Sequence, residues 1–377
     1  MQRIYLDNAA TTAIDPEVLS AMMPYFTEKF GNPSSVYSYG RETRLAVENA
    51  RKKVAEIIHA RPGEILFTSC GTESTNTAVN AAINDLGCTT IITSPIEHHA
   101  TLHSVEHAAQ VNKIKLAYVS LDGKGHVRED SLRTLLENAG GRCLVSLMHA
   151  NNEIGNLLKV KNIARICEEF DAVFHCDTVQ TVAHYPIDVT EFKVHFISAS
   201  AHKFHGPKGI GFLYINDCIK IHPYIHGGGQ ERNMRAGTEN MYGIVGMAKA
   251  LEMATENYEQ EHKHIAGLKQ YMIEQLSSNF TGLHYNGDYN GSSLYTVLNV
   301  GFPKNEKTEM LLFSLDMAGI CVSGGSACSS GANHGSHVIG TIYPDVEMVP
   351  IRFSFSKYNT KEEIDQVVSV IKGILED

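Results

Sequence analysis

A lysine stands in the segment 198–211, SASAHKFHGPKGIG, at the expected end of a strand and before a Gly-Pro turn. Its neighbours include serine and histidine, side chains that can bind anions and move protons. An amine in this setting is suited to form a Schiff base with an aldehyde cofactor, which makes Lys203 the candidate cofactor lysine. Taken alone, the segment is also compatible with a solvated loop lysine, so the other motifs must decide.

A carboxylate in the segment HCDTVQ (175–180) could serve the same cofactor. Asp177 follows a strand of the buried type, where an ionised carboxylate needs a positive partner or hydrogen-bond donors. A protonated pyridine nitrogen would be such a partner, and the ring would then act as an electron sink for a carbanion on the substrate. Gln180 could hydrogen-bond a hydroxyl on that ring. A helix-capping aspartate is the alternative interpretation.

The segment SCGTES (69–74) follows an expected strand and opens an expected helix. Gly71 permits a close backbone approach, and the amide of Thr72 would point outward at an anion such as a phosphate. Ser200 and His202 offer further donors to the same phosphate. An ordinary helix N-terminus would have a similar sequence.

Histidines gather in the segment PIEHHATLH, after another expected strand. His98 lies in the turn, where an imidazole could stack on a cofactor ring and transfer protons near neutral pH. His99, His103 and His107 share one helix face, but no cysteine or carboxylate completes a ligand set. We therefore expect no metal site.

One cysteine differs from the others in its surroundings. Cys328 stands in GGSACSSG (324–331), without the apolar neighbours that would bury a thiol. An exposed thiol in a glycine-rich loop is suited to carry sulfur, although an incidental exposed cysteine is the alternative. No C-x-x-C pair occurs. Four cysteines in apolar runs are expected to be small buried residues: Cys143, Cys167, Cys176 and Cys321.

Apolar strand-like runs alternate with amphipathic helical stretches over most of the chain. The expected strands are 64–69, 89–94, 143–148, 172–176, 196–200 and 210–215. The expected helices are one from about residue 73, then 100–111, 160–170 and one long stretch over 241–276. This alternation predicts an α/β fold with a mainly parallel, helix-covered sheet, and the long helix would lead to a second lobe.

The composition is that of a globular protein with a large core, since 43% of its 377 residues are hydrophobic. No stretch approaches about 20 uninterrupted apolar residues, and the N-terminus does not resemble a signal peptide. We expect a cytoplasmic protein that does not bind membranes directly. The net charge of −10, without a basic tract, gives no strong nucleic-acid signal.

Seven segments together resemble the cysteine desulfurases of the NifS/IscS type, in the class-V aminotransferase family. They are LDNAATT (6–12), GNPSS (31–35), MHANNEIG (148–155), HCDTVQ (175–180), SAHKFHGPKG (200–209), HGGGQERNMRAGTEN (226–240) and GGSACSSG (324–331). The resemblance covers nearly the whole chain. It implies the aminotransferase-like fold of pyridoxal-phosphate enzymes, known as fold-type I, and a homodimer.

The same resemblance, together with the pattern of elements, suggests how the chain is divided. We expect a large cofactor-binding domain over residues 15–259. A smaller α+β domain would comprise residues 1–14 and 260–377, and it would carry the catalytic cysteine loop at about 323–336.

The resemblance assigns the cofactor contacts residue by residue. It implies that Lys203 holds pyridoxal 5′-phosphate, that Asp177 pairs with the ring nitrogen and that Gln180 contacts the ring hydroxyl. His98 would stack on the ring. The phosphate would be held by Gly71, Thr72, Ser200 and His202, with Thr238 reaching over from the neighbouring subunit.

It also implies a substrate and a reaction. Asn152 and Arg352 would bind the carboxylate of L-cysteine, a task suited to a guanidinium group, although a surface salt bridge is the alternative for Arg352. Sulfur would pass to Cys328 as a persulfide, with L-alanine as the other product and His98 as a proton-transfer group. The persulfide would supply an acceptor protein, such as an iron–sulfur scaffold, or tRNA thiolation.

Two other functions remain open at this point. The chain could be another fold-type I aminotransferase or lyase that uses Lys203 and Asp177 but not Cys328. It could also be a catalytically silent sulfur carrier or scaffold-binding protein.

Overall fold

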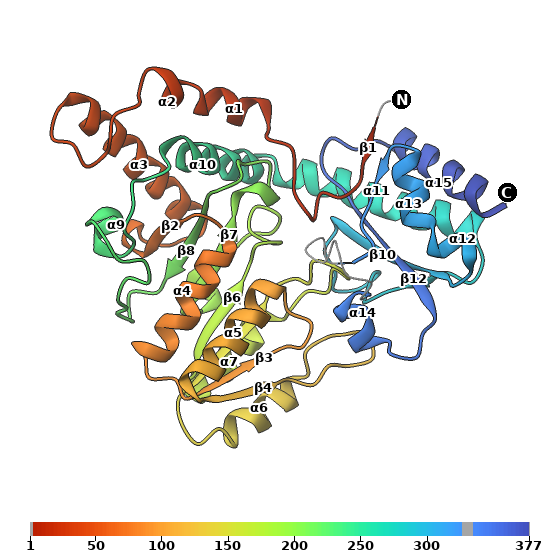
Figure 1. The fold of residues 1–377 in the computed structure, drawn as a ribbon, viewed down its shortest axis with the longest axis horizontal. Helices are drawn as coiled ribbons and strands as arrows, with labels where there is room; N and C mark the ends of the chain where they lie inside the picture. The colour runs from red at the N-terminus through yellow and green to blue at the C-terminus, as the bar shows by residue number, and fades with distance from the viewer. Residues whose placement is uncertain (1–2, 326–334, 377) are drawn as a thin grey trace.

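The computed structural model describes residues 3–325 and 335–376, in two bodies (Figure 1). The strands are β1 Ile4–Tyr5, β2 Ile65–Thr68, β3 Thr90–Thr93, β4 Lys115–Tyr118, β5 Cys143–Met148, β6 Val173–Asp177, β7 Phe196–Ser200, β8 Gly211–Ile215, β9 His284–Tyr285, β10 Val297–Pro303, β11 Ile320–Cys321 and β12 Met348–Ser354. The larger helices are α1 Pro16–Met22, α3 Ser38–Ile57, α4 Gly71–Asn84, α5 His99–Asn112, α6 Glu129–Glu137, α7 Val160–Glu169, α10 Met241–Glu256, α11 Tyr258–Asn279, α13 Leu311–Met317, α14 His337–Ile342 and α15 Lys361–Glu376. Short helical turns are α2 Pro24–Thr27, η1 Pro62–Glu64, α8 Val189–Phe192, η2 Ala201–Lys203, α9 Gln230–Asn233 and α12 Glu306–Glu309.

The larger body is built on a seven-stranded sheet with the order β2-β8-β7-β6-β5-β3-β4. Strands β4, β3, β5, β6 and β7 are parallel, and β8 is antiparallel to both of its neighbours. Helices α5, α6, α7 and α8 provide the crossovers that parallel neighbours need. The expected mainly parallel, helix-covered sheet is confirmed, and the expected strand ends differ by one residue at most.

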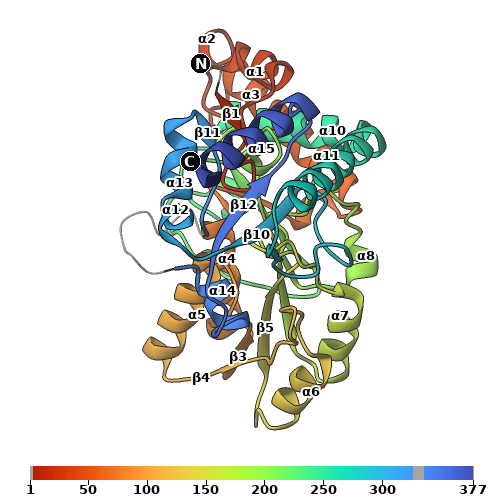
Figure 2. The same cartoon turned by 90° about the vertical axis from the view of Figure 1, so that its right-hand side faces the viewer.

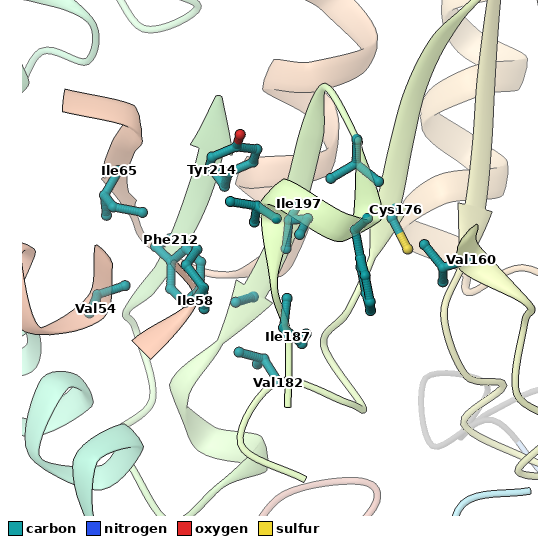
Figure 3. Close-up of a cluster of buried hydrophobic side chains, with 14 of the residues drawn as sticks. Val54, Ile58, Ile65, Val160, Cys176, Val182, Ile187, Ile197, Phe212 and Tyr214 are labelled. Atoms are coloured by element: carbon teal, nitrogen blue, oxygen red, sulfur yellow. The ribbon is translucent and has the colours of Figure 1, made fainter. Parts of the chain in front are cut away.

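Both faces of this sheet are buried, because side chains alternate between them. On β6, Cys176 points into a core shared with α3, α7 and α10, whereas Val173 points into a second core under α4 and α5. Figure 3 shows part of the first core, where Val54 and Ile58 lie close to Phe212 of β8. Because both faces are buried, the register of each strand is fixed, and with it the side chains that face α4.

Toward their carboxyl ends, the central strands change from apolar to polar on the face under α4. His175 of β6 hydrogen-bonds Ser146 of β5 through Nδ1 and Ser198 of β7 through Nε2, both at 2.8 Å. Thr75 of α4 donates to Ser198 at 3.2 Å. These buried groups satisfy one another, so a polar row can cross the core without unpaired atoms.

The smaller body is built on β10, which pairs antiparallel with β12 and β9. Side chains of α11, α13 and α15 join it in a separate core. Strand β1 pairs with β11, so the first residues lie in this body, close to the C-terminal helix α15 (Figure 2). The expected domain boundaries stay a prediction.

Two expectations from the sequence are wrong. The long helix expected over 241–276 is two helices, because Asn257 leaves helical geometry (φ −103°, ψ 8°) and its side chain caps α10 by donating to Met253 O at 2.8 Å. Cys321 is partly exposed rather than buried, since it lies in a two-residue strand of a two-stranded sheet. Cys143, Cys167 and Cys176 are buried as expected.

Within the described ranges, none of the helices has the length and apolar character needed to cross a membrane.

Several histidines are buried in the neutral form. Burial lowers the pKa of His175 to about 3, and the pKa values of His149 and His184 to about 4. In the unfolded chain these imidazoles titrate near 6.5. As the pH falls below about 6.5, the unfolded state therefore binds protons that the folded state does not, and each histidine removes stability down to its folded pKa.

We expect His175→Gln to make the protein less stable near neutral pH but also less sensitive to acid. The variant loses one of the two serine contacts. Because glutamine does not titrate, however, this position no longer destabilises the folded state as the pH falls from about 6.5 to about 3. The slope of its free energy of unfolding against pH should be smaller than that of the wild type, by up to about 1.4 kcal/mol per pH unit. Urea unfolding at a series of pH values measures both slopes, and parallel slopes would contradict the prediction.

Candidate active site

A cavity of about 330 Å³ opens at the carboxyl ends of β5, β6 and β7, the usual ligand position in a parallel sheet. It brings together ten of the twelve residues that the sequence singled out. They are Gly71, Thr72, His98, Asn152, Asp177, Gln180, Ser200, His202, Lys203 and Arg352. Ala9, Ala10, Cys70, Ala100, Met148, Ala150 and Val179 complete the lining.

Lys203 ends η2, the short turn that follows β7. Its Nζ donates to the backbone carbonyls of Ala9 at 2.6 Å and Ala10 at 2.9 Å. The solvated-loop alternative is therefore wrong, because the amine points into the cavity and is held by the N-terminal segment. An amine held in this way is suited to react with an aldehyde.

Asp177 is the last residue of β6 and lies on the same face as the polar row. Its Oδ1 accepts from the amide of Val179 at 2.9 Å. Burial raises the pKa of this carboxyl to about 6, against the favourable effects of that hydrogen bond and of Lys203. A buried carboxylate with too few partners is suited to a cationic ligand, so a pyridinium nitrogen fits here. Gln180 donates to Ala9 O at 3.1 Å, which fixes its amide beside the cavity.

The other end of the cavity is suited to a phosphate group. Helix α4 begins there, at Gly71, where a Cβ atom would stand 2.6 Å from Val179 Cγ2, so only glycine allows the helix this close. The hydroxyl of Ser200 is buried and has no hydrogen-bond partner in the described part of the chain. A ligand oxygen would satisfy it. Thr72 follows in the first turn of α4, at the helix end that favours anions.

His202 lies beside this end of the cavity and contacts the N-terminal segment. Its Nδ1 is 3.1 Å from the hydroxyl of Thr11. Burial, with a further contribution from Lys203, lowers the pKa of His202 to about 4, so the ring is neutral at neutral pH. A neutral ring can still donate one N–H to a phosphate oxygen.

His98 occupies the N-cap of α5, and its Nδ1 accepts from the amide of Ala100 at 3.1 Å. The neutral ring therefore carries its proton on Nε2. Burial, followed by the nearby Lys203, lowers the pKa of His98 to about 4. At neutral pH this imidazole is a neutral group that can stack on a ring.

Arg352 lies on β12 and brings the smaller body into the site. The residue is 1% exposed, and its Nη2 pairs with Asp7 at 2.7 Å while Nη1 donates to Asn152 O at 2.9 Å. The alternative of a surface salt bridge is wrong, because Arg352 is buried and Asp7 is only partly exposed. Nε has no partner among the described residues, so the guanidinium keeps donors for a ligand carboxylate.

Two of the expected site residues are not in this cavity. Thr238 is exposed on its own chain and does not line the cavity. Cys328 lies outside the described residues. Among the described residues, no group of three histidine, cysteine or acidic side chains is arranged to hold a metal ion.

Sequence reasoning missed the contribution of the segment LDNAATT (6–12), which it used only as a family motif. Asp7 pairs with Arg352, Thr11 contacts His202, and the carbonyls of Ala9 and Ala10 hold Lys203. Every residue carries a backbone carbonyl, so the residue types at positions 9 and 10 could not reveal that these carbonyls hold Lys203. The acidic side chain of Asp7 was a signal, but its partner is 345 residues away.

This chain is similar to known proteins over nearly its whole length. The family model described as Aminotransferase class-V matches residues 4–367. Among relatives, a cysteine desulfurase IscS from Dictyoglomus turgidum is 43% identical, covering 100% of this chain and 95% of the relative. A cysteine desulfurase IscS from Methanosarcina thermophila is 42% identical, with 99% and 92% covered.

Solved structures resemble this chain over its whole length. A NifS-like protein superposes with a TM-score of 0.91 at 38% identity, with both chains fully covered. A NifS-like protein from Rickettsia africae gives a TM-score of 0.90 at 29% identity, again with both chains fully covered.

The carboxylate at the end of β6 provides a test of the cavity. For pyridoxal phosphate, the cofactor expected from the sequence, we expect Asp177→Asn to weaken retention by about 10- to 100-fold, since a charge-assisted hydrogen bond contributes about 1.5–3 kcal/mol. The asparagine keeps the acceptor for Val179, so β6 should end as before. Cofactor release during dialysis, followed by absorbance, measures the effect.

Glu64→Gln is the matched control, because Glu64 is a buried carboxylate outside the cavity. Equal cofactor retention in Asp177→Asn and the wild type would contradict the assignment.

Proposed function

This chain belongs to the class-V aminotransferase family and, within it, to the NifS/IscS-type cysteine desulfurases, and from that premise we propose that it converts L-cysteine to L-alanine with transfer of sulfur to Cys328. The reaction would use pyridoxal phosphate. The observation that carries the proposal is one cavity that holds the amine of Lys203, the buried carboxylate of Asp177 and the hydroxyl of Ser200, which has no partner among the described residues. A cytoplasmic location, expected from the sequence, is part of the proposal.

The cofactor site would extend from Asp177 at the ring nitrogen to Thr72, Ser200 and His202 at the phosphate. Gln180 would contact the ring hydroxyl and His98 would stack on the ring. Bound there, pyridoxal phosphate would withdraw electrons from the substrate α-carbon and make its proton acidic. The buried carboxylate of Asp177 favours the cationic ring nitrogen on which this chemistry depends.

The substrate carboxylate would bind to Arg352 and Asn152. Arg352 supports this role because its guanidinium is buried, is held in place by Asp7 and keeps Nε without a partner among the described residues. A planar guanidinium can bind a carboxylate through two parallel hydrogen bonds. This contact would orient the α-carbon of L-cysteine toward Lys203.

Two groups would move protons. We assign removal of the α-proton to Nζ of Lys203, which the carbonyls of Ala9 and Ala10 hold within the cavity. We assign to His98 the exchange of protons with the thiol groups. Because burial lowers its pKa to about 4, the ring is neutral at physiological pH, and the proton that it can give is the one on Nε2.

The sulfur step needs no external oxidant. The thiolate of Cys328 attacks the substrate sulfur, so that a sulfur–sulfur bond forms while the bond from sulfur to the substrate β-carbon breaks. The electron pair of the broken bond stays with that carbon, which gains a proton and becomes the methyl group of alanine. The products are L-alanine and a Cys328 persulfide, which would pass sulfur to an acceptor such as an iron–sulfur scaffold or a tRNA-thiolation protein.

The alternative functions are not favoured. A silent sulfur carrier would have no use for the cavity that gathers Lys203, Asp177 and Arg352. An aminotransferase or lyase that ignores Cys328 would share this cavity, but the cysteine desulfurases at up to 43% identity support the desulfurase.

The deciding experiment is product release from L-cysteine in the presence of a thiol reductant. We expect the wild type to release sulfide and alanine in equal amounts. Cys328→Ala should lose sulfide release by on the order of 10²-fold or more, because it lacks the nucleophile, while still changing its cofactor spectrum on addition of cysteine. Cys218→Ala, which removes an exposed cysteine elsewhere, should behave as the wild type.

Two outcomes would count against the proposal. Equal sulfide release from Cys328→Ala and the wild type would assign the enzyme to the aminotransferases or lyases of this fold. Purified protein without a cofactor absorption band, even after addition of pyridoxal phosphate, would favour the silent carrier.

We also propose that the active unit is a homodimer. Exposed large apolar side chains occur on α1, α2, α3 and α10 and in the segment between α2 and α3. Figure 1 shows α1, α2 and α3 at its upper left. This N-terminal apolar patch comprises Leu19, Met23, Phe26, Phe30, Val36, Tyr37, Tyr39, Leu45 and Tyr242. Thr238, exposed and four residues before Tyr242, would reach the phosphate of the second copy from this side. So large an apolar surface is typical of an interface.

Charges in the N-terminal apolar patch should separate the dimer. We expect Val36→Glu combined with Leu45→Glu to shift sedimentation from dimer to monomer, because both side chains are exposed on one chain and would be desolvated between two. The matched control is Val111→Glu on α5, where the valine is 62% exposed outside the patch. An unchanged dimer in the double variant would refute this interface.

A further inference from the structure

A buried glutamate in the segment MHANNEIG has no role in the proposed chemistry. Glu153 is 0% exposed, and its Oε2 accepts a hydrogen bond from the hydroxyl of Ser336. Its Oε1 has no partner in the described part of the chain. Burying a carboxyl group with so few partners is unfavourable for folding, so a role beyond stability is indicated.

Ser336 is the second described residue after residues 326–334. Its Oγ accepts from the amide of Ile339 at 3.0 Å, which caps α14, and the same hydroxyl donates to Glu153. Val338 of α14 packs with Ile154, the residue after Glu153. The carboxyl of Glu153 therefore fixes the start of α14 against the turn at 151–155.

Gly325, the last described residue before that stretch, lies against the same two side chains. A Cβ atom on Gly325 would stand 3.1 Å from Ser336 Cβ and 3.7 Å from Glu153 Oε2. The carbonyl of Gly325 accepts from the hydroxyl of Ser323 at 2.7 Å. Glu153 thus hydrogen-bonds Ser336 after the sequence interval in which Cys328 stands, and its carboxyl lies near Gly325 before that interval.

The same interval is joined to the residues that would bind the substrate carboxylate. Ser323 and Arg352 exchange two backbone hydrogen bonds, at 3.2 and 2.6 Å. Arg352 Nη1 donates to the carbonyl of Asn152, the residue before Glu153. The contacts therefore form a closed ring, from Glu153 through Ser336, Gly325 and Ser323 to Arg352 and Asn152.

We propose that Glu153 is a positioning residue for sulfur transfer: it joins the two ends of the interval that contains Cys328 and ties them to the pair that binds the substrate carboxylate. The inference rests on the proposed function. Glu153 touches neither substrate nor cofactor in this scheme, and it acts through Ser336. Reaction rates are sensitive to small displacements of reacting atoms, so loosening this ring should slow the sulfur step.

The test separates binding from sulfur transfer. Glu153→Leu removes the acceptor, and we expect kcat for sulfide release to fall about tenfold or more, while the KM for L-cysteine and the spectral change on adding cysteine stay within about twofold. Glu153→Gln keeps a side-chain oxygen for Ser336 and should restore most of the rate. The rate at which iodoacetamide alkylates Cys328, followed by peptide mass mapping, should change in Glu153→Leu only.

Variants at Ser336 separate the helix cap from the contact with Glu153. Ser336→Thr keeps both and should resemble the wild type. Ser336→Asp can cap α14 but brings a second carboxyl against Glu153, so it should reproduce the slow sulfide release of Glu153→Leu. Thr341→Ala, an exposed change on α14, is the control for helix stability.

The outcomes are distinct from those of the proposed function. If the wild type releases no sulfide, the proposed function itself fails. If the wild type is active and Glu153→Leu keeps its full kcat, this inference is overturned. It is also overturned if Glu153→Leu loses the spectral response together with the rate, or if Glu153→Gln is as slow as Glu153→Leu, since neither result is expected of a positioning hydrogen bond.

Discussion

The active site depends on one segment, residues 6–12, which connects the two bodies of the molecule and turns at residues 8–10. At one end, the amide of Ser354 on β12 donates to Leu6 O at 2.7 Å, and Asp7 pairs with Arg352. At the other end, the carbonyls of Ala9 and Ala10 hold the amine of Lys203. The same few residues therefore set the distance between the cofactor lysine on the large sheet and the guanidinium of the smaller body.

The large sheet can support such a site because its polarity changes along the strands. Near their amino ends, apolar side chains face both cores, and the sheet is held by burial on two sides. Farther along, the face under α4 carries the row of Ser146, His175 and Ser198, which satisfy one another. Two residues beyond this row, burial raises the pKa of Asp177, and the hydroxyl of Ser200 has no hydrogen-bond partner among the described residues. A cofactor with a positive charge and a phosphate group would stabilise the first and bind the second.

The smaller body contributes Arg352 to the active site. Arg352 is fixed on β12 by backbone pairing with β10 and with Ser323. Through Asn152 and Glu153 it is also connected to the turn at 151–155 of the larger body. In the mechanism we propose, substrate recognition and the approach of the catalytic cysteine would therefore share one rigid set of contacts, so that a correctly bound carboxylate and a correctly placed sulfur acceptor occur together.

The sequence alone predicted the class of fold and ten residues of the cavity, because these depend on local patterns: apolar runs of strand length, glycines at turns and motifs in a fixed order. It did not predict the break at Asn257, since helical periodicity continues across it. Only the tertiary structure decided which groups meet. Asp7 lies 345 residues from Arg352, Ala9 lies 194 from Lys203 and Glu153 lies 183 from Ser336. Contacts across such separations depend on how the two bodies pack, and two of them involve a backbone carbonyl or a buried carboxyl whose partner no local pattern reveals.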